Sequence, residues 1–172
     1  MKRIISLMLI VSLLIIPSGC GTGRTDADQA VPFFYLRASD SYIYGATDGV
    51  ISFEHRDSAG HSADLNYLLM LYLQGPLAED LVSPFPQGCK ILQLDRKEGK
   101  LTVLLNANMA TLRGMDLTLA CVCFAKTCFS LTDAESVRIM VKTFDGKISI
   151  DQTITIDSLL LEDTEVPDQS GK

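Results

Sequence analysis

The strongest constraint on the fold is an apolar run at residues 119–125, which continues with Cys128 and Phe129. Gly114 precedes this segment, and Asp116 is well placed to interact with the positive end of a helix dipole. These features predict a helix over residues 115–130. Because apolar side chains fall on nearly every side of such a helix, the rest of the chain must cover it almost completely.

A second helix is predicted over residues 63–74. Its apolar residues recur at the spacing of one helical face, and they are Leu65, Leu68, Leu69 and Tyr72. Ser62 is expected to cap the amino terminus of this helix. Gly75 and Pro76 end it, because glycine accepts the left-handed conformation and proline cannot continue a helix.

The remaining β-prone segments are short and are separated by turn residues. Residues 31–37 are rich in Phe, Tyr and Leu and predict a strand that is buried on both faces. The other predicted strands are residues 42–44, 50–54, 90–96, 100–106, 137–141 and, as one or two edge strands, 147–156. Asp48-Gly49 and residues 97–99 predict hairpins between neighbouring strands. Residues 77–88 are expected to form a loop with Phe85 turned inwards.

This order of strands and helices predicts an α+β fold. We expect one compact domain over residues 31–161, with two helices packed on one face of a mixed or antiparallel sheet. A length of 172 residues suits a single domain. The polar tail, residues 162–172, is expected to be disordered.

The amino terminus has the pattern of a secretory signal. Lys2 and Arg3 precede an apolar run over residues 4–16 that is broken only by Ser6 and Ser12. This run is short for a transmembrane helix, which needs about 20 residues to cross about 30 Å of hydrocarbon. It suits the apolar region of a signal peptide.

Ser18 and Gly19, directly before Cys20, resemble the lipobox of bacterial lipoproteins. The resemblance implies that residues 1–19 are removed and that Cys20 carries fatty acyl chains such as palmitate. It also implies a location on the extracytoplasmic face of the cell membrane. Pro17 departs from the aliphatic residue usual at its position, and the alternative is an uncleaved signal anchor. The small, polar residues 20–30 are expected to form a flexible tether.

The charge of the chain limits its partners. Removal of residues 1–19 takes away Lys2 and Arg3, so the formal charge of −6 becomes −8. Nucleic-acid binding requires clustered Lys and Arg, which an acidic domain lacks, so we expect no nucleic-acid partner. The same charge disfavours electrostatic attachment to anionic lipid headgroups.

The five cysteines raise the question of a metal site or a disulfide. Cys121 and Cys123 point about 200° apart around the predicted helix, and Cys121 and Cys128 lie about 10 Å apart along it. A disulfide requires Cα atoms about 4.4–6.8 Å apart, so these three cannot bridge one another. Cys89 could pair with one of them. Otherwise these thiols act as small buried apolar groups.

His55 and His61 lie near Asp57 and Asp64 in a polar segment. A catalytic or metal site is conceivable there, but solvated side chains are the simpler interpretation. The sequence lacks a nucleophile elbow, a phosphate-binding glycine loop and a His-Glu-x-x-His helix. We therefore expect no catalytic residues, no bound metal and no cofactor.

Two groups of side chains are candidates for a partner surface. One is an aromatic group, comprising Phe33, Phe34, Tyr35, Tyr42 and Tyr44. The other is the apolar edge formed by Ile154, Ile156 and residues 159–161, because an exposed strand edge can pair with another chain. Each group could equally belong to the domain's own core.

Several segments in a fixed order resemble the GerM domain, a family of bacterial envelope and sporulation proteins. They are residues 68–76 (LLMLYLQGP), 83–88 (SPFPQG), 91–95, Gly99, 101–105, 117–129, 137–141 and Asp145-Gly146. The resemblance runs from about Phe33 to Gly146 and implies a fold similar to the ring-building modules of secretion-like assemblies. It further implies a role in envelope assembly during sporulation or germination, and it supplies no catalytic residues.

The expected function is that of a membrane-anchored protein-interaction domain. Its expected partners are the membrane, through lipid on Cys20, and other envelope proteins or a second copy of the chain. One alternative is a small ligand-binding lipoprotein associated with a transporter or a cell-wall process. Another is a hydrolase, which would require a carboxylate or histidine with a perturbed pKa in a cleft.

Overall fold

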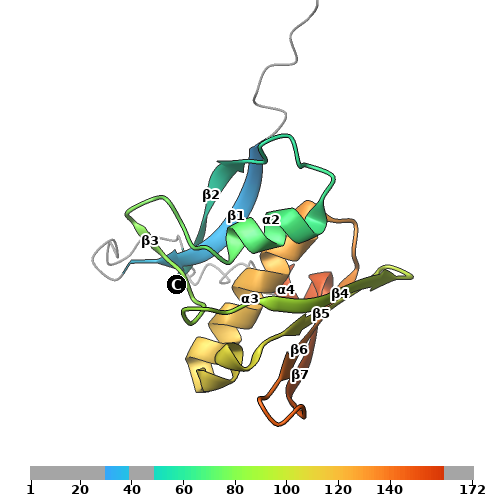
Figure 1. Ribbon diagram of the computed structural model, residues 1–172. Helices are drawn as coiled ribbons and strands as arrows, with labels where there is room; N and C mark the ends of the chain where they lie inside the picture. The colour runs from blue at the N-terminus through green and yellow to red at the C-terminus, as the bar shows by residue number, and fades with distance from the viewer. Residues whose placement is uncertain (1–29, 39–48, 161–172) are drawn as a thin grey trace, which may run out of the picture.

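The computed structural model describes residues 30–38 and 49–160. The elements follow in the order β1 (Ala30–Arg37), β2 (Ile51–Asp57), α2 (Leu65–Tyr72), β3 (Leu81–Val82), β4 (Ile91–Lys97), β5 (Lys100–Leu105), a 3-10 helix η4 (Ala107–Thr111), α3 (Gly114–Leu131), β6 (Ser136–Lys142), β7 (Ile148–Thr155) and α4 (Ile156–Leu160) (Figure 1). The predicted signal peptide, Cys20, the predicted strand 42–44 and the predicted tail lie outside the described residues.

The described strands form two sheets. One is antiparallel with the order β2-β1-β3, and the other has the order β4-β5-β6-β7. In the second sheet β5 and β6 are parallel, and the other neighbours are antiparallel. The chain passes from β5 to its parallel neighbour β6 through α3, as a parallel pair requires a crossover. The predicted α+β class is confirmed, with the strands divided between two sheets.

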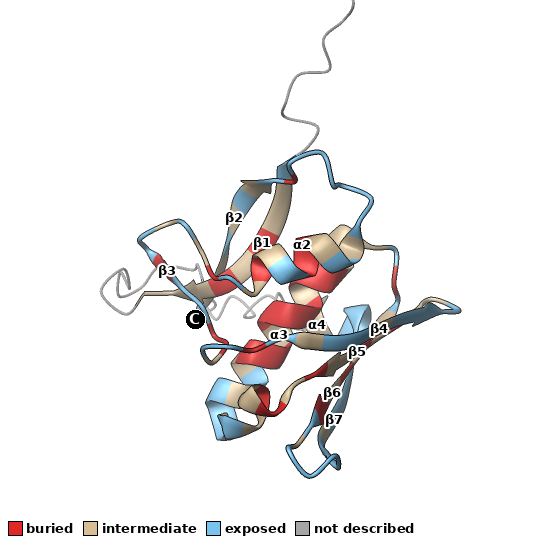
Figure 2. Cartoon of the chain, viewed as in Figure 1, coloured by how far each residue is buried: buried red, intermediate tan, exposed pale blue. Residues whose placement is uncertain are grey.

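Helix α3 lies between the two sheets and contacts both β1 and β6 (Figure 1). Its buried side chains occur on several sides, and they are Ala120, Cys121, Cys123, Phe124, Ala125, Thr127 and Cys128 (Figure 2). Among the described helices α3 is long and apolar enough to cross a membrane, a property that core helices of soluble domains share. Its packing against both sheets explains the apolar run that the sequence shows.

The helix also covers a strand edge. Strand β3 pairs with β1 only at Leu36 and Arg37, so the rest of that edge of β1 needs other partners. The Thr127 hydroxyl accepts a hydrogen bond from the Phe34 amide at 3.0 Å, and the Ser130 hydroxyl donates to the Pro32 carbonyl at 3.1 Å. These two side chains satisfy backbone groups that a neighbouring strand would otherwise bind.

Two tyrosines join β1 to α2 through the core. The Tyr35 hydroxyl donates to the Tyr72 carbonyl at 2.8 Å, and the Tyr72 hydroxyl donates to the Phe34 carbonyl at 2.7 Å. Phe33, Phe85 and Phe124 pack around the Tyr72 ring with centroids 5.3–6.0 Å away. The predicted inward position of Phe85 is therefore confirmed.

The predicted burial of β1 on both faces is wrong. Phe33 and Tyr35 are fully buried, but Phe34 on the opposite face is only half-buried. Phe34 contacts Phe53 of β2, which is 50% exposed. The reason is that α2 packs against only one face of this sheet, so the alternate side chains of β1 face a surface.

The length of β2 differs from the prediction, and its described partner is β1. The predicted hairpin between residues 42–44 and 50–54 involves residues 42–44, which lie outside the described residues. β2 continues to Asp57, opposite Ala30, so His55 belongs to a strand and only His61 lies in the following turn. The pairing with β1 extends β2, which the polar composition of residues 54–57 did not indicate.

Helix α2 begins later than predicted. Its N-cap is Asp64, whose carboxylate accepts a hydrogen bond from the Tyr67 amide at 3.0 Å. The predicted cap, Ser62, is exposed in the turn before it. The expected end is confirmed, since α2 stops at Tyr72 and Gly75 has a φ of 96°.

The second hairpin agrees with the sequence. β4 and β5 pair around Gly99, and Leu101, Val103 and Leu105 are fully buried on one face of β5. In β6, Val137, Ile139 and Val141 occupy the corresponding face. Residues 147–156 form one edge strand, β7, with Ile156 already in α4. The predicted loop 77–88 contains the short strand β3.

We predict that Thr127→Val destabilises the domain by about 1–3 kcal/mol, because the buried Phe34 amide loses its acceptor without a change in side-chain shape. Urea unfolding followed by circular dichroism measures this loss. The matched control is Thr118→Val in the same helix, where the hydroxyl is exposed and bonds to the Gly114 carbonyl. Equal stability of the two variants would show that the Thr127 hydroxyl does not support the edge of β1.

Candidate functional site

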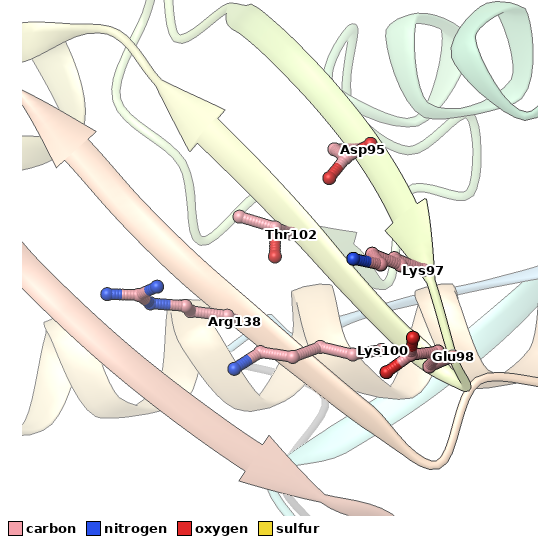
Figure 3. Close-up of a pocket in the computed structure, with 6 residues that line it drawn as sticks. All are labelled: Asp95, Lys97, Glu98, Lys100, Thr102 and Arg138. Atoms are coloured by element: carbon pink, nitrogen blue, oxygen red, sulfur yellow. The ribbon is translucent and has the colours of Figure 1, made fainter.

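The outer face of the four-stranded sheet is one candidate surface. In β5 the buried residues alternate with Lys100, Thr102 and Leu104, which are half-buried on the opposite face. Figure 3 shows α3 behind this sheet and the side chains of the outer face in front of it. Since sheet residues alternate between faces, the inner face serves the core and the outer face is available for contact.

One end of this face holds a polar depression of about 330 Å³. Its lining side chains come from β4, β5, β6 and the hairpin turn, and they are Asp95, Lys97, Glu98, Lys100, Thr102 and Arg138 (Figure 3). Arg138 is engaged by Asp151 of β7 through two hydrogen bonds of 2.7 and 2.5 Å. This ion pair lowers the pKa of Asp151. The depression therefore combines acidic and basic groups rather than a single charge.

The other end of the same face is apolar. A second depression of about 180 Å³ is lined by Gln93, Asp95, Thr102, Leu104, Met140 and Ile148. Ile148 is 44% exposed, while Leu104 and Met140 are half-buried. An apolar centre beside charged groups is the usual anatomy of a protein–protein contact surface.

A groove of about 330 Å³ lies between α2 and the start of β4. It is lined by Met70, Leu73, Gln74, Cys89, Lys90 and Ile91. Its volume falls at the lower end of the range of small-molecule sites, which is about 300–1,000 Å³. This groove is where a small ligand of the predicted alternative function would fit.

The described cysteines, Cys89, Cys121, Cys123 and Cys128, are free and buried. Burial raises the pKa of Cys89 and Cys121 to about 11 and that of Cys123 to about 12. Cys128, which is fully buried, has a pKa raised further still. Such thiols stay protonated at neutral pH and act as small apolar core residues. The predicted alternative of a Cys89 disulfide is wrong in this structure.

The two histidines occupy separate exposed positions. The ring of His55 meets Phe53 edge-on at 5.3 Å, and the ring of His61 lies 4.2 Å from that of Tyr67. The neighbouring carboxylates serve the backbone, since Asp57 accepts from the Ala59 amide and Asp64 caps α2. Within residues 30–38 and 49–160, no three His, Cys, Asp or Glu side chains are grouped to hold a metal ion.

The structure reveals a carboxylate clamp that the sequence did not indicate. Glu54 accepts hydrogen bonds from the Leu77 and Ala78 amides at 2.9–3.1 Å and pairs with Arg56 at 2.9 Å. Arg56 also donates to the Gly75 carbonyl at 3.1 Å. The side chains of this ion pair are only about a tenth exposed, at 11% and 10%. Glu54 and Arg56 thus fix the segment that follows α2 onto β2.

The predicted aromatic surface is divided by the fold. Phe33 and Tyr35 belong to the core, Phe34 lies on the half-exposed face of β1, and Tyr42 and Tyr44 lie outside the described residues. The predicted apolar edge is also divided. Ile154 and Leu159 pack against the core, and Ile156 is 43% exposed.

Comparison with known proteins finds similarity among solved structures. No protein-family model and no curated protein matches the sequence. Among solved structures, the chain is similar to the tandem GerMN domains of the sporulation protein GerM from Bacillus subtilis, with 17% sequence identity and a TM-score of 0.44. The match covers 71% of this chain and 44% of that one, so it spans less than half of that protein's length. It assigns neither an activity nor a partner to this chain.

We predict that Glu54→Gln destabilises the domain by about 1–3 kcal/mol, because a neutral amide can neither accept from all the backbone amides nor balance Arg56. Thermal or urea unfolding measures the loss. The matched control is Asp151→Asn, which breaks an exposed ion pair, and its effect should be smaller. A larger loss in the control would contradict the assignment of Glu54 as a clamp.

The buried thiols predict a loss of stability at alkaline pH. Cys121 has a pKa near 11, above the ordinary value of 9.0, so the unfolded chain loses its proton first. The contribution of this protonated thiol to the free energy of unfolding is complete below about pH 9 and is lost between pH 9 and 11. Between pH 8 and pH 10.5, the free energy of unfolding should therefore fall by about 2 kcal/mol less in Cys121→Ala than in the wild type. Identical pH profiles of the urea midpoint in both proteins would refute this assignment.

Proposed function

We propose that this chain is an extracytoplasmic lipoprotein whose α+β domain binds other envelope proteins through the outer face of its four-stranded sheet. The observation that supports binding most directly is the composition of that face. It places an apolar group, Leu104, Met140 and Ile148, beside a charged group that includes Lys100 and Arg138. An apolar group beside a mixed group of acidic and basic side chains favours a protein partner over a nucleic acid.

The proposed anchor is lipid on Cys20. The support is the sequence Ser18-Gly19-Cys20 after an apolar run at residues 4–16. Two or more acyl chains hold a protein stably on a bilayer, whereas one chain gives only marginal binding. The acidic charge of the chain favours such a hydrophobic anchor over attachment to anionic headgroups.

The proposed process is envelope assembly, with sporulation or germination as its more specific form. This part of the proposal depends on the resemblance of ordered segments, such as residues 68–76 and 83–88, to the GerM domain. The proposed role is binding rather than catalysis. In support, Glu54 is occupied by backbone amides and Arg56, and the described thiols are buried.

We predict that the membrane-extracted protein begins at Cys20 and carries the added mass of its acyl chains. Cys20→Ala should retain residues 1–19 and gain no lipid mass, because the acylated thiol is absent. Mass spectrometry of the intact protein distinguishes the two forms. Cys89→Ala is the matched control and should be processed like the wild type. A wild-type protein that retains Met1 would overturn the proposed anchor.

We predict that a photo-crosslinking amino acid at Met140 forms adducts with other envelope proteins in intact cells, because Met140 lies in the apolar part of the outer face. The control position is Asn66, which is exposed on α2. Mass spectrometry of the adducts identifies the partners. Adducts that are absent, or that form equally from both positions, would contradict binding through the outer face.

A further inference from the structure

Within residues 30–38 and 49–160, strand β7 has a paired strand on one side of its backbone and none on the other. It is the last strand in the order β4-β5-β6-β7, and among the described strands it pairs only with β6. The Ile156 amide donates to the Glu135 carbonyl, on the side of β6. Because backbone groups alternate along a strand, Ile154, Gln152 and Ile150 also face β6. Asp151 and Thr153 therefore direct their amides and carbonyls away from the sheet.

The other described edges carry features that discourage pairing. Strand β4 has three charged residues in succession, Asp95, Arg96 and Lys97, and a register shift between Ile91 and Gln93. Strand β3 has only two residues, and β2 ends with the exposed, charged Asp57. Charges, irregular register and short length are the means by which proteins protect strand edges.

Strand β7 lacks this protection at its centre. It spans eight residues, with the sequence ISIDQTIT, and contains isoleucine and threonine, which favour strands. Its single charged residue, Asp151, is held by Arg138 of the neighbouring strand at 2.7 Å. The side chain that would repel a partner strand is thus neutralised within the same sheet.

We infer that two copies of this chain pair through β7, antiparallel, about a two-fold axis at Gln152. In this register Asp151 of each copy lies opposite Thr153 of the other, and both residues direct their backbone groups across the junction. Each such pair exchanges two backbone hydrogen bonds. Ile150 lies opposite Ile154 of the second copy on the inner face, where both are half-buried in the single chain.

The sequence of β7 favours a second copy as the partner. Residues 150–154 have an isoleucine at each end, equally distant from Gln152, so the two isoleucines exchange places when the segment is reversed. A two-fold axis at Asp151 would place two carboxylates opposite each other, which is unfavourable. The charged β4 edges would then form both ends of the joined sheet, so the assembly closes as a dimer instead of growing into a filament.

This inference depends on the proposed function in one respect, because a lipid anchor would raise the local concentration of the chain on the membrane. Backbone pairing itself needs no anchor. The two ideas concern different parts of the sheet, namely the outer face at Met140 and the free edge at Thr153. Their experiments therefore give independent results.

The first test is disulfide trapping with the full-length protein in its membrane. In the proposed dimer, the Cα atoms of the two Gln152 residues would lie about 4.5 Å apart, as in a non-hydrogen-bonded antiparallel pair. Gln152→Cys should then give a disulfide-linked dimer under mild oxidation, because this distance permits a disulfide. Thr155→Cys, on the same exposed strand but opposite Ser149 of the second copy, should give no disulfide-linked dimer, because the two introduced thiols lie too far apart. No dimer from Gln152→Cys, or equal dimer from both variants, would overturn the pairing.

The second test separates pairing from folding. In Thr153→Pro the lost amide is the one that points away from β6, so the ladder within the domain is kept. We expect the urea midpoint of Thr153→Pro to stay close to that of Thr153→Ala. Dimer formation of Thr153→Pro in detergent should be at least tenfold weaker than that of Thr153→Ala. Mass photometry of the full-length protein measures the dimer. A folded Thr153→Pro protein that dimerises like Thr153→Ala would refute the inference. If the crosslinker at Met140 still captured envelope proteins in that case, the proposed function would stand and the proposed self-association alone would be refuted.

Discussion

The burial of α3 between two sheets is the constraint on which the rest of this structure depends. The helix contacts β1 on one side and β6 on the other, so neither sheet could keep its buried face without it. Its polar side chains also have a structural task, because Thr127 and Ser130 satisfy backbone groups of β1 that β3 leaves unpaired. One helix therefore supplies both the apolar centre of the core and a substitute for a missing strand.

This arrangement buries the described thiols and nearly buries the Glu54 carboxylate. Three of the four free thiols lie on α3 and are buried with it, and the Glu54 carboxylate is enclosed by backbone amides and Arg56. Among the described residues, the outer face of the four-stranded sheet is exposed or half-buried. A sheet used in this way suits contact with other proteins, because its exposed residues are fixed in position by the buried residues between them.

The elements that the sequence predicted best are those with strong periodicity. The alternation of Leu101, Val103 and Leu105, and the apolar run at residues 119–125, both follow from burial patterns that do not depend on the partner. The failures have different causes, because the cap of α2 was a choice between nearby residues, whereas the length of β2 and the Glu54 clamp depend on distant contacts. Asp64 caps α2 in place of Ser62, and β2 continues to Asp57 because β1 lies beside it. The Glu54 clamp likewise joins residues 23 and 24 positions apart, without a local pattern.

The sequence by itself determined the α+β class, the two principal helices and the hairpin at Gly99, because each depends on local spacing or composition. Only the tertiary structure decided that the described strands form two sheets, that α3 lies between them, and that β7 is the last described strand of its sheet. The physical reason is that strand pairing joins backbone groups, which are the same in every residue. Side-chain periodicity shows that a strand exists, but the choice of its neighbour depends on how the whole chain packs.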